Sequence, residues 1–111
     1  RVKFFSGSQR DCKFCKACEE TTDHFLYDCA ILRSLYISIG ELLRQHYDFY
    51  VPKRDHFLAF YIGRDENFIN ATITKVHQIL YAKRSSNEYD ISGVLNMAKI
   101  HLHVLKNVLK L

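Results

Sequence analysis

Residues 12–29 read CKFCKACEETTDHFLYDC and contain all four cysteines of the chain. Two residues separate Cys12 from Cys15, and four separate His24 from Cys29. A Cys-x2-Cys pair forms a tight turn that brings two sulfurs to one ion, and three thiolates with one imidazole make a closed tetrahedral zinc site. The spacing therefore predicts Zn2+ held by Cys12, Cys15, His24 and Cys29. Because a closed site leaves no position for a reactive water, we expect a structural metal rather than a hydrolytic one.

Cys18 offers an alternative set of ligands. Cys15, Cys18, His24 and Cys29 have a spacing close to that of a retroviral zinc knuckle. Disulfides are less suitable, since they help most when they join distant parts of a chain and here residues 30–111 would have none. We favour the set with Cys12 and expect Cys18 to be a spare thiol. His24 and Cys29 would lie about one and a half turns apart on an α-helix, so we expect a short, broken first helix.

Hydrophobic periodicity predicts helices over most of the remaining chain. From Ala30 to about His46, and again after Asp65, apolar residues recur every three or four positions, which is typical of amphipathic helices. A third helix is expected over roughly 91–109, with Asp90 as its N-cap. The chain has only four glycines and one proline, too few turn residues for a many-stranded β sandwich. The sequence therefore predicts an all-α fold, a short zinc knuckle followed by three or four packed helices.

The segments around these helices are less regular. Residues 1–11 lack helical periodicity and indicate an extended lead-in or a short strand, and residues 47–52 indicate a loop. Residues 55–62 are apolar and fit either a short helix or a strand. We expect a basic lead-in and CCHC knuckle over residues 1–29 and a helical region over residues 30–111. We expect the two to form one compact unit within a longer chain.

The positive charge of the chain, net +4, gathers toward its two ends. The first 16 residues carry five cations and a single acid. Because Cys12 and Cys15 must turn toward the metal, the residues between and beside them are pushed outward. We therefore expect Arg10, Lys13 and Lys16 to contact phosphates, with Phe14 beside them in a position to stack on an exposed base. The alternative for the aromatic residues of this region, which we favour for the group as a whole, is a small core around the knuckle.

The last predicted helix is apolar on more than one face and includes Met97, Ile100 and Val104. A helix that is apolar nearly all round is buried on several sides, so we infer that it docks onto something outside this fragment. The histidines after His24 lack a nearby nucleophile in sequence and are expected on the surface or at the edge of the core. No apolar run approaches the roughly 18 residues that span a bilayer.

The knuckle resembles the C-terminal zinc-binding segment of non-LTR retrotransposon reverse transcriptases. The resemblance rests on Cys12-Lys-Phe-Cys15, the acidic and threonine stretch over residues 19–22, and His24-Phe-Leu-Tyr-Asp-Cys29. An aromatic residue follows seven positions later, where Tyr36 stands in place of the usual tryptophan. The region 57–63 with the helix after it, and the final helix bearing lysine and histidine, are also similar to the family.

The resemblance implies that this fragment is the noncatalytic tail of a large polyprotein with endonuclease and reverse transcriptase activities. Such a tail would bind template RNA or target DNA during target-primed reverse transcription, inside the cell, in the cytoplasm and nucleus. Its expected partners are nucleic acid and the rest of the polyprotein, with no membrane and no small-molecule substrate. The alternative is a structural zinc-pinned helical module that docks on the polymerase or on a host protein without touching nucleic acid.

Overall fold

The computed structural model describes residues 11–16 and 18–109. Its α-helices are α1 (Ala30–His46), α2 (Arg54–Leu58), α3 (Glu66–Ser85) and α4 (Val94–Val104). Two five-residue π-helical turns complete them, η1 (His24–Asp28) before α1 and η2 (Leu105–Leu109) after α4. The described residues form no strand, only an isolated bridge between Asp11 and Glu19. The predicted all-α fold, a knuckle followed by packed helices, is confirmed.

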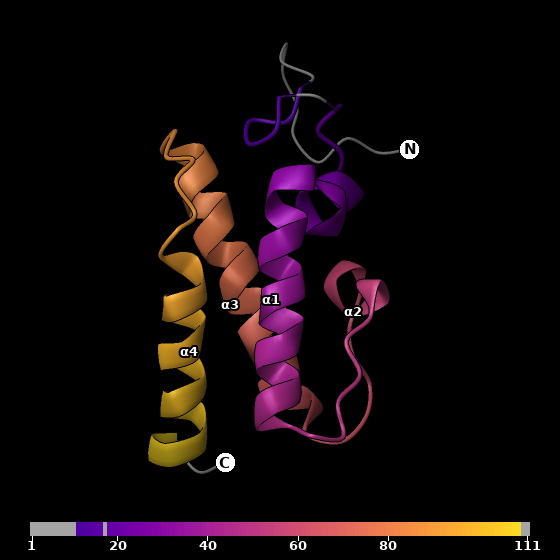
Figure 1. The fold of residues 1–111 in the computed structure, drawn as a ribbon, viewed down its shortest axis with the longest axis vertical. Helices are drawn as coiled ribbons and strands as arrows, with labels where there is room; N and C mark the ends of the chain where they lie inside the picture. Colours follow the sequence, from indigo (N-terminus) through magenta and orange to yellow (C-terminus); the bar gives the residue numbers. More distant parts are fainter. Residues whose placement is uncertain (1–10, 17, 110–111) are drawn as a thin grey trace.

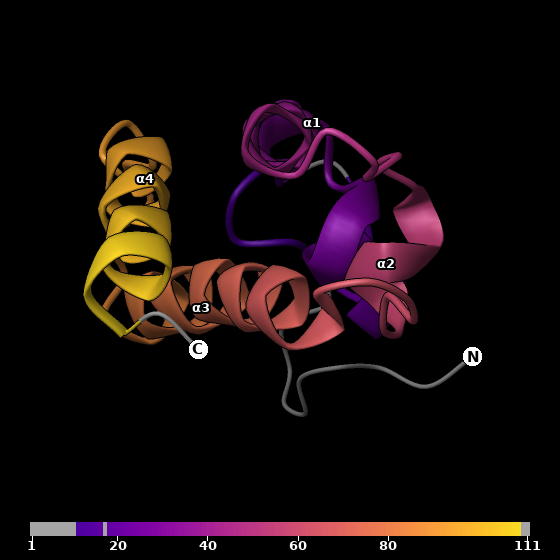
Figure 2. The ribbon, with the colours of Figure 1, turned by 90° about the horizontal axis from the view of Figure 1, so that it is seen from below.

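The three long helices pack side by side beneath the knuckle. Figure 1 shows α1, α3 and α4 running along the length of the molecule, with the knuckle segment at one end. Seen end-on in Figure 2, α3 contacts α4 on one side and α1 lies across from it. Helix α4 contacts both α3 and α1. No helix in the described part of the chain is long and apolar enough to cross a membrane.

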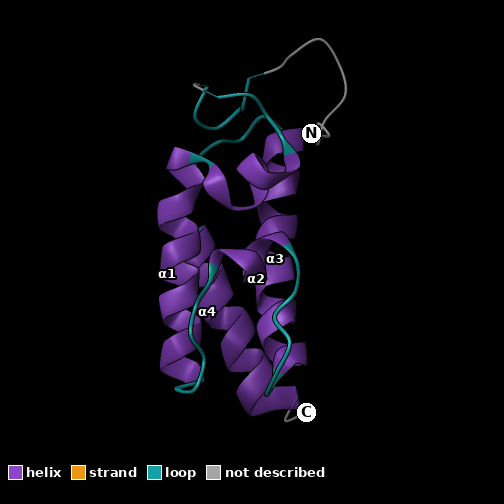
Figure 3. Ribbon diagram, turned by 90° about the vertical axis from the view of Figure 1, so that its right-hand side faces the viewer, coloured by secondary structure: helices purple, strands orange, loops and turns teal. Residues whose placement is uncertain are grey.

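The connection between α1 and α3 carries α2 to the knuckle. In Figure 3 this connection rises as a loop to α2 and returns as a second loop to the start of α3. Helix α2 contacts η1, where Arg54 forms a bidentate ion pair with Asp28, Nη2 to Oδ2 at 2.7 Å and Nε to Oδ1 at 2.9 Å. The segment that periodicity left open, residues 55–62, is therefore a single helical turn followed by irregular chain.

One hydrophobic core joins the knuckle to the helices. Helix α1 buries the residues spaced three and four apart that the sequence places on one face, Leu32, Leu35, Tyr36, Ile39 and Leu43. Helix α3 contributes Ile69, Ile73, Val76 and Leu80, and α4 contributes Val94, Ala98 and Leu102. Cys12, Phe25 and Cys29 belong to the same buried cluster. The metal-binding residues therefore sit on top of the helical core and are continuous with it.

One predicted helix start differs from the observed one, and another agrees with it. The last helix begins at Val94, not at 91, because the Asp90 carboxylate accepts the Ser92 N–H at 3.0 Å and closes a turn instead of capping the helix. Helix α3 begins at Glu66 as predicted, but Asp65 lies in the left-handed region with φ 56° and makes no side-chain cap. The lead-in over residues 1–10, including Arg10, lies outside the described residues.

Candidate metal centre

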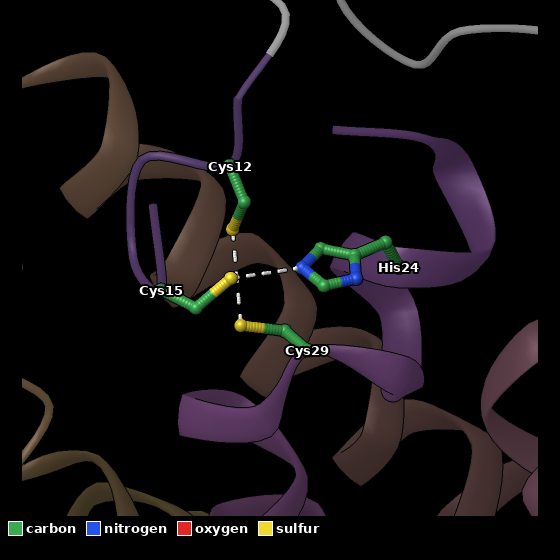
Figure 4. Close-up of side chains that lie close together, drawn as sticks. All are labelled: Cys12, Cys15, His24 and Cys29. Atoms are coloured by element: carbon green, nitrogen blue, oxygen red, sulfur yellow. Dashed lines mark hydrogen bonds between the residues drawn. The ribbon is translucent and has the colours of Figure 1, made fainter. Parts of the chain in front are cut away.

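Four ligand atoms converge at the knuckle, and Figure 4 shows them pointing toward one another. The sulfurs of Cys12, Cys15 and Cys29 and an imidazole nitrogen of His24 all lie within 4.8 Å of one another. Cys12 Sγ is 3.7 Å from Cys29 Sγ, and Cys15 Sγ is 3.3 Å from His24 Nε2. A tetrahedral ion with sulfur ligands at 2.3 Å requires sulfur-to-sulfur separations of about 3.8 Å. These four residues therefore fit one metal ion, and they are the four that the spacing predicted.

A tight turn positions the first two ligands. The Cys12 N–H donates to the Cys18 carbonyl at 2.8 Å, and the Lys16 N–H donates to the Cys12 carbonyl at 2.9 Å. Lys16 adopts a left-handed conformation with φ 58°, which lets the chain reverse directly after Cys15. Both cysteine side chains thereby reach the same side of the turn.

A π-helical turn positions the other two ligands. Thr21 begins it, since its Oγ1 accepts the His24 N–H at 3.2 Å and its carbonyl accepts the Phe25 N–H at 3.0 Å. The Cys29 N–H then donates to the His24 carbonyl at 2.8 Å. This π-type hydrogen bond joins residues five apart and brings both ligand side chains to the same side of the turn. Cys29, with ψ 128°, ends the turn before α1 begins at Ala30. The predicted short and broken first helix is confirmed.

The two buried sulfurs are electrostatically unequal. A hydrogen bond from the Cys29 thiol stabilises the Cys12 thiolate and lowers the pKa of Cys12 to about 5. The same hydrogen bond, together with burial, raises the pKa of Cys29. One thiolate is thus available at neutral pH, and a bound cation supplies the charge that ionises the other sulfurs.

Cys18 is not a member of this cluster. Its side chain is exposed and lines a shallow cavity together with Glu19 and Asp28. The alternative ligand set, in which Cys18 replaces Cys12, therefore does not match the geometry.

Tyr36 supports the knuckle from α1. Its hydroxyl donates to the Phe25 carbonyl at 2.7 Å, and its ring stacks on Tyr27 with centroids 5.9 Å apart. Burial raises the pKa of Tyr36, so the hydroxyl stays protonated as a donor. The aromatic residue seven positions after the last cysteine therefore braces the π-helical turn between His24 and Cys29.

Polar contacts that the sequence did not predict attach the knuckle to α3. The Glu20 carboxylate forms a bidentate ion pair with Arg84, 64 residues later, at 2.6 Å and 3.0 Å. His77 Nε2 lies 3.1 Å from the Leu26 carbonyl. Glu20 stands in a polar run and nothing in the sequence distinguishes it from a solvated carboxylate, so no local signal could have found this pair.

The residues expected to contact nucleic acid lie in different environments. Lys16 is exposed and Lys13 is half-buried, with its backbone N–H 3.4 Å from Glu20 Oε2. Phe14 packs edge-on against Tyr89 with centroids 5.3 Å apart and lies 6.4 Å from Phe25. The Phe14 ring is therefore part of the small core beside the metal site. Contact of these residues with nucleic acid stays a prediction.

Comparison with family models, with curated proteins and with solved structures found no match for this chain. The fold and the Cys/His cluster described above therefore carry the functional argument by themselves.

Proposed function

We propose that this chain is a noncatalytic, zinc-stabilised domain that binds nucleic acid, of the kind found at the C-terminus of non-LTR retrotransposon reverse transcriptases. Its role would be to hold template RNA or target DNA near the polymerase during target-primed reverse transcription, in the cytoplasm and nucleus. The observation that carries the proposal is the closed cluster of Cys12, Cys15, His24 and Cys29. Three sulfurs and one imidazole favour zinc over harder ions, because thiolates are soft ligands.

Two features support a structural role for the metal. Four protein ligands complete a tetrahedron, so no position remains for a reactive water. Cys12 and Cys29 are buried in the same core as the helices, so the metal connects the knuckle to the fold. We therefore infer that the domain performs no catalysis itself.

The exposed side of the knuckle supports binding to a polyanion. Lys16 is exposed at the reversal of the turn, and the half-buried Lys13 lies three residues before it in the same turn. Cations at such positions grip phosphates without regard to sequence, and the affinity then falls steeply as salt is raised.

Binding of labelled single-stranded RNA and of duplex DNA, titrated at several salt concentrations, tests this function. We expect weak affinity, roughly micromolar or poorer at physiological salt. The double variant Lys13→Ala/Lys16→Ala should bind less tightly with a shallower salt slope. The matched control is Lys75→Ala/Lys99→Ala, which removes two exposed lysines from α3 and α4. Equal affinity and equal salt slope for the first double variant and the parent would contradict the proposal.

A second candidate function is docking onto another protein. Met97, Ile100 and Val104 on α4 are 46%, 57% and 38% exposed, and a run of large apolar side chains on one helix favours contact with a partner. Apolar docking is insensitive to salt, so the same titration series separates the two functions.

A further inference from the structure

A second cavity, of about 320 Å3, lies at the end of the molecule opposite the metal centre. It is partly open to solvent and is lined by the residues after α1, those before α3 and the start of η2. Its lining includes Tyr47, Phe49, Arg64, Asp65 and Lys106. The volume falls within the range of small-ligand sites in proteins.

Tyr47 lines this cavity, and its hydroxyl has no hydrogen-bond partner among the described residues. Tyr47 is only 6% exposed, its hydroxyl oxygen is buried, and no hydrogen bond reaches that oxygen from the described residues. Burial and the nearby charge of Asp65 raise the pKa of Tyr47, so the hydroxyl is a proton donor. Buried polar groups in folded proteins almost always have a partner, so this hydroxyl is left to donate to a water or a ligand atom that reaches it from the cavity.

Two cations line the same cavity. The Lys106 ammonium lies 4.9 Å above the Tyr47 ring and donates to the His46 carbonyl at 2.9 Å. The Arg64 guanidinium lies 4.7 Å above the Phe49 ring. Within residues 11–16 and 18–109, neither cation forms an ion pair, so Lys106 retains two N–H donors and Arg64 all five. Contact with these aromatic rings holds the guanidinium and the ammonium group at the cavity.

The cavity also has acceptors. Asp48 and Asp65 line it, and neither carboxylate lies within ion-pair distance of Arg64 or Lys106. A lone inorganic anion would meet repulsion from these carboxylates. A ligand that combines an anionic group with hydrogen-bond donors satisfies both sets of side chains. A nucleotide is such a ligand, because its phosphate oxygens accept while the N–H groups of its base donate.

We propose that this cavity binds one nucleotide unit, with its phosphate held by Arg64, Lys106 and the Tyr47 hydroxyl. The inference rests on the proposed function in that bound nucleic acid would supply the nucleotide. It adds a site at the far end of the helices from the knuckle, so that a single strand would be held at two separated points.

Nuclear magnetic resonance titration of the zinc-loaded chain tests the site. The probes are inorganic phosphate, guanosine 5′-monophosphate and a single-stranded oligonucleotide. We expect guanosine monophosphate to shift the amide signals of residues 46–49, 64–66 and 105–107 and to bind more tightly than inorganic phosphate. Lys106→Ala should weaken its binding by about tenfold and Tyr47→Phe by a few-fold, since each removes one donor. Lys99→Ala, on the outer side of α4, should leave its binding unchanged.

Three results would overturn the site. They are equal affinity for phosphate and nucleotide, equal weakening by Lys99→Ala and Lys106→Ala, and shifts confined to the knuckle. The oligonucleotide separates this inference from the proposed function. If the oligonucleotide binds the parent, Lys106→Ala and Tyr47→Phe equally, the cavity site fails while nucleic-acid binding stands. If guanosine monophosphate occupies the cavity but the oligonucleotide does not bind, the cavity site stands and the proposed function fails.

Discussion

Glu20 in the knuckle and Arg84 near the end of α3 form a bidentate ion pair that is almost completely buried. Arg84 Nη2 lies 2.6 Å from Oε1 of the carboxylate and Nε lies 3.0 Å from Oε2. The Glu20 side chain is 2% exposed and that of Arg84 is 18% exposed. Two parallel hydrogen bonds fix orientation as well as distance. This pair therefore determines how the metal-binding segment sits against the helices.

Removal of Arg84 should destabilise the fold strongly. Arg84→Ala leaves the Glu20 carboxylate buried without a counter-charge, at a cost of about 3 kcal/mol in the free energy of unfolding. Glu20→Gln keeps the size of the side chain and part of the hydrogen bonding, so it should cost about 1–2 kcal/mol. Urea unfolding followed by circular dichroism measures both.

The control for this prediction is Arg33→Ala on α1. Arg33 is exposed, and its removal should change stability by no more than about 0.5 kcal/mol. If Arg84→Ala costs no more than Arg33→Ala, the ion pair does not hold the knuckle in place.

The ligand set makes a second prediction. The chain should bind one zinc ion, and Cys12→Ser, Cys15→Ser and Cys29→Ser should each lose it, since each removes one corner of the tetrahedron. Cys18→Ser is the matched control and should retain one zinc, because Cys18 lies outside the cluster. Zinc content of the purified variants measures this. Loss of the metal in Cys18→Ser with retention in Cys12→Ser would show that the ligand set is wrong.

Chelation should loosen the knuckle more than the helices. Metal binding is coupled to folding, and the fully buried apolar contacts between the knuckle and the core are those of Phe25 and the two buried cysteines. Amide hydrogen exchange should therefore quicken most in the described residues up to 35. A uniform increase along the whole chain would mean that the metal holds the entire fold together instead.

Local patterns were sufficient to predict the features that depend on neighbours in sequence. Helix α1 occupies the predicted residues Ala30–His46 because its apolar spacing and its buried face coincide. The metal cluster likewise follows from spacing, since Cys-x2-Cys leaves few possible geometries for the turn. Helix α4 was predicted to begin too early, because Asp90 is equally suited to cap a helix or to close a turn, and Gly93 delays the helix.

Contacts between distant residues could not be predicted from the sequence. Glu20 and Arg84 are 64 positions apart, and Asp28 and Arg54 are 26 apart. Each is a charged residue of a kind that usually faces solvent. Their partners follow only from how the helices pack around the knuckle, which hydrophobic periodicity leaves open. That the Tyr47 hydroxyl is buried without a partner among the described residues could not be predicted from the sequence for the same reason.

Gly40 makes a fourth prediction, because glycine is unfavourable inside a helix and yet the packing at this position requires it. A Cβ atom at this position would lie 2.8 Å from Pro52 Cβ, in the loop that packs against α1. Alanine has the better helix propensity by about 1 kcal/mol, but the clash with a rigid proline ring should outweigh it. Gly40→Ala should therefore lower the free energy of unfolding by about 1–2 kcal/mol.

Gly93→Ala is the comparison for this variant. Nothing lies within 4 Å of a Cβ placed at Gly93, so its replacement should cost less than that of Gly40. Chemical unfolding of both variants measures the difference. A Gly40→Ala protein that is more stable than the parent would mean that residues 50–53 move aside without cost.

The last prediction concerns pH and His77. Burial lowers the pKa of His77, outweighing the opposite effect of its hydrogen bond to the Leu26 carbonyl. The ring, which also packs against Tyr36 and Phe57, is therefore neutral in the folded state and donates Nε2–H to that carbonyl. In the unfolded chain the same imidazole takes up a proton near its ordinary pKa of 6.5. As pH falls through 6.5 the unfolded state binds more protons than the folded state, so stability falls by up to roughly 1.4 kcal/mol per pH unit until the lowered pKa is reached.

His77→Gln isolates this effect, because the amide can donate to the Leu26 carbonyl but does not titrate. The variant should lose less stability than the parent between pH 7.5 and pH 6, measured by urea unfolding at each pH. Protonation of the metal ligands is common to both proteins and cancels in the difference. His103→Gln, at an exposed position on α4, should follow the parent. If His77→Gln also follows the parent, then His77 is protonated equally in the folded and unfolded chains, and its contact with Leu26 does not require the neutral ring.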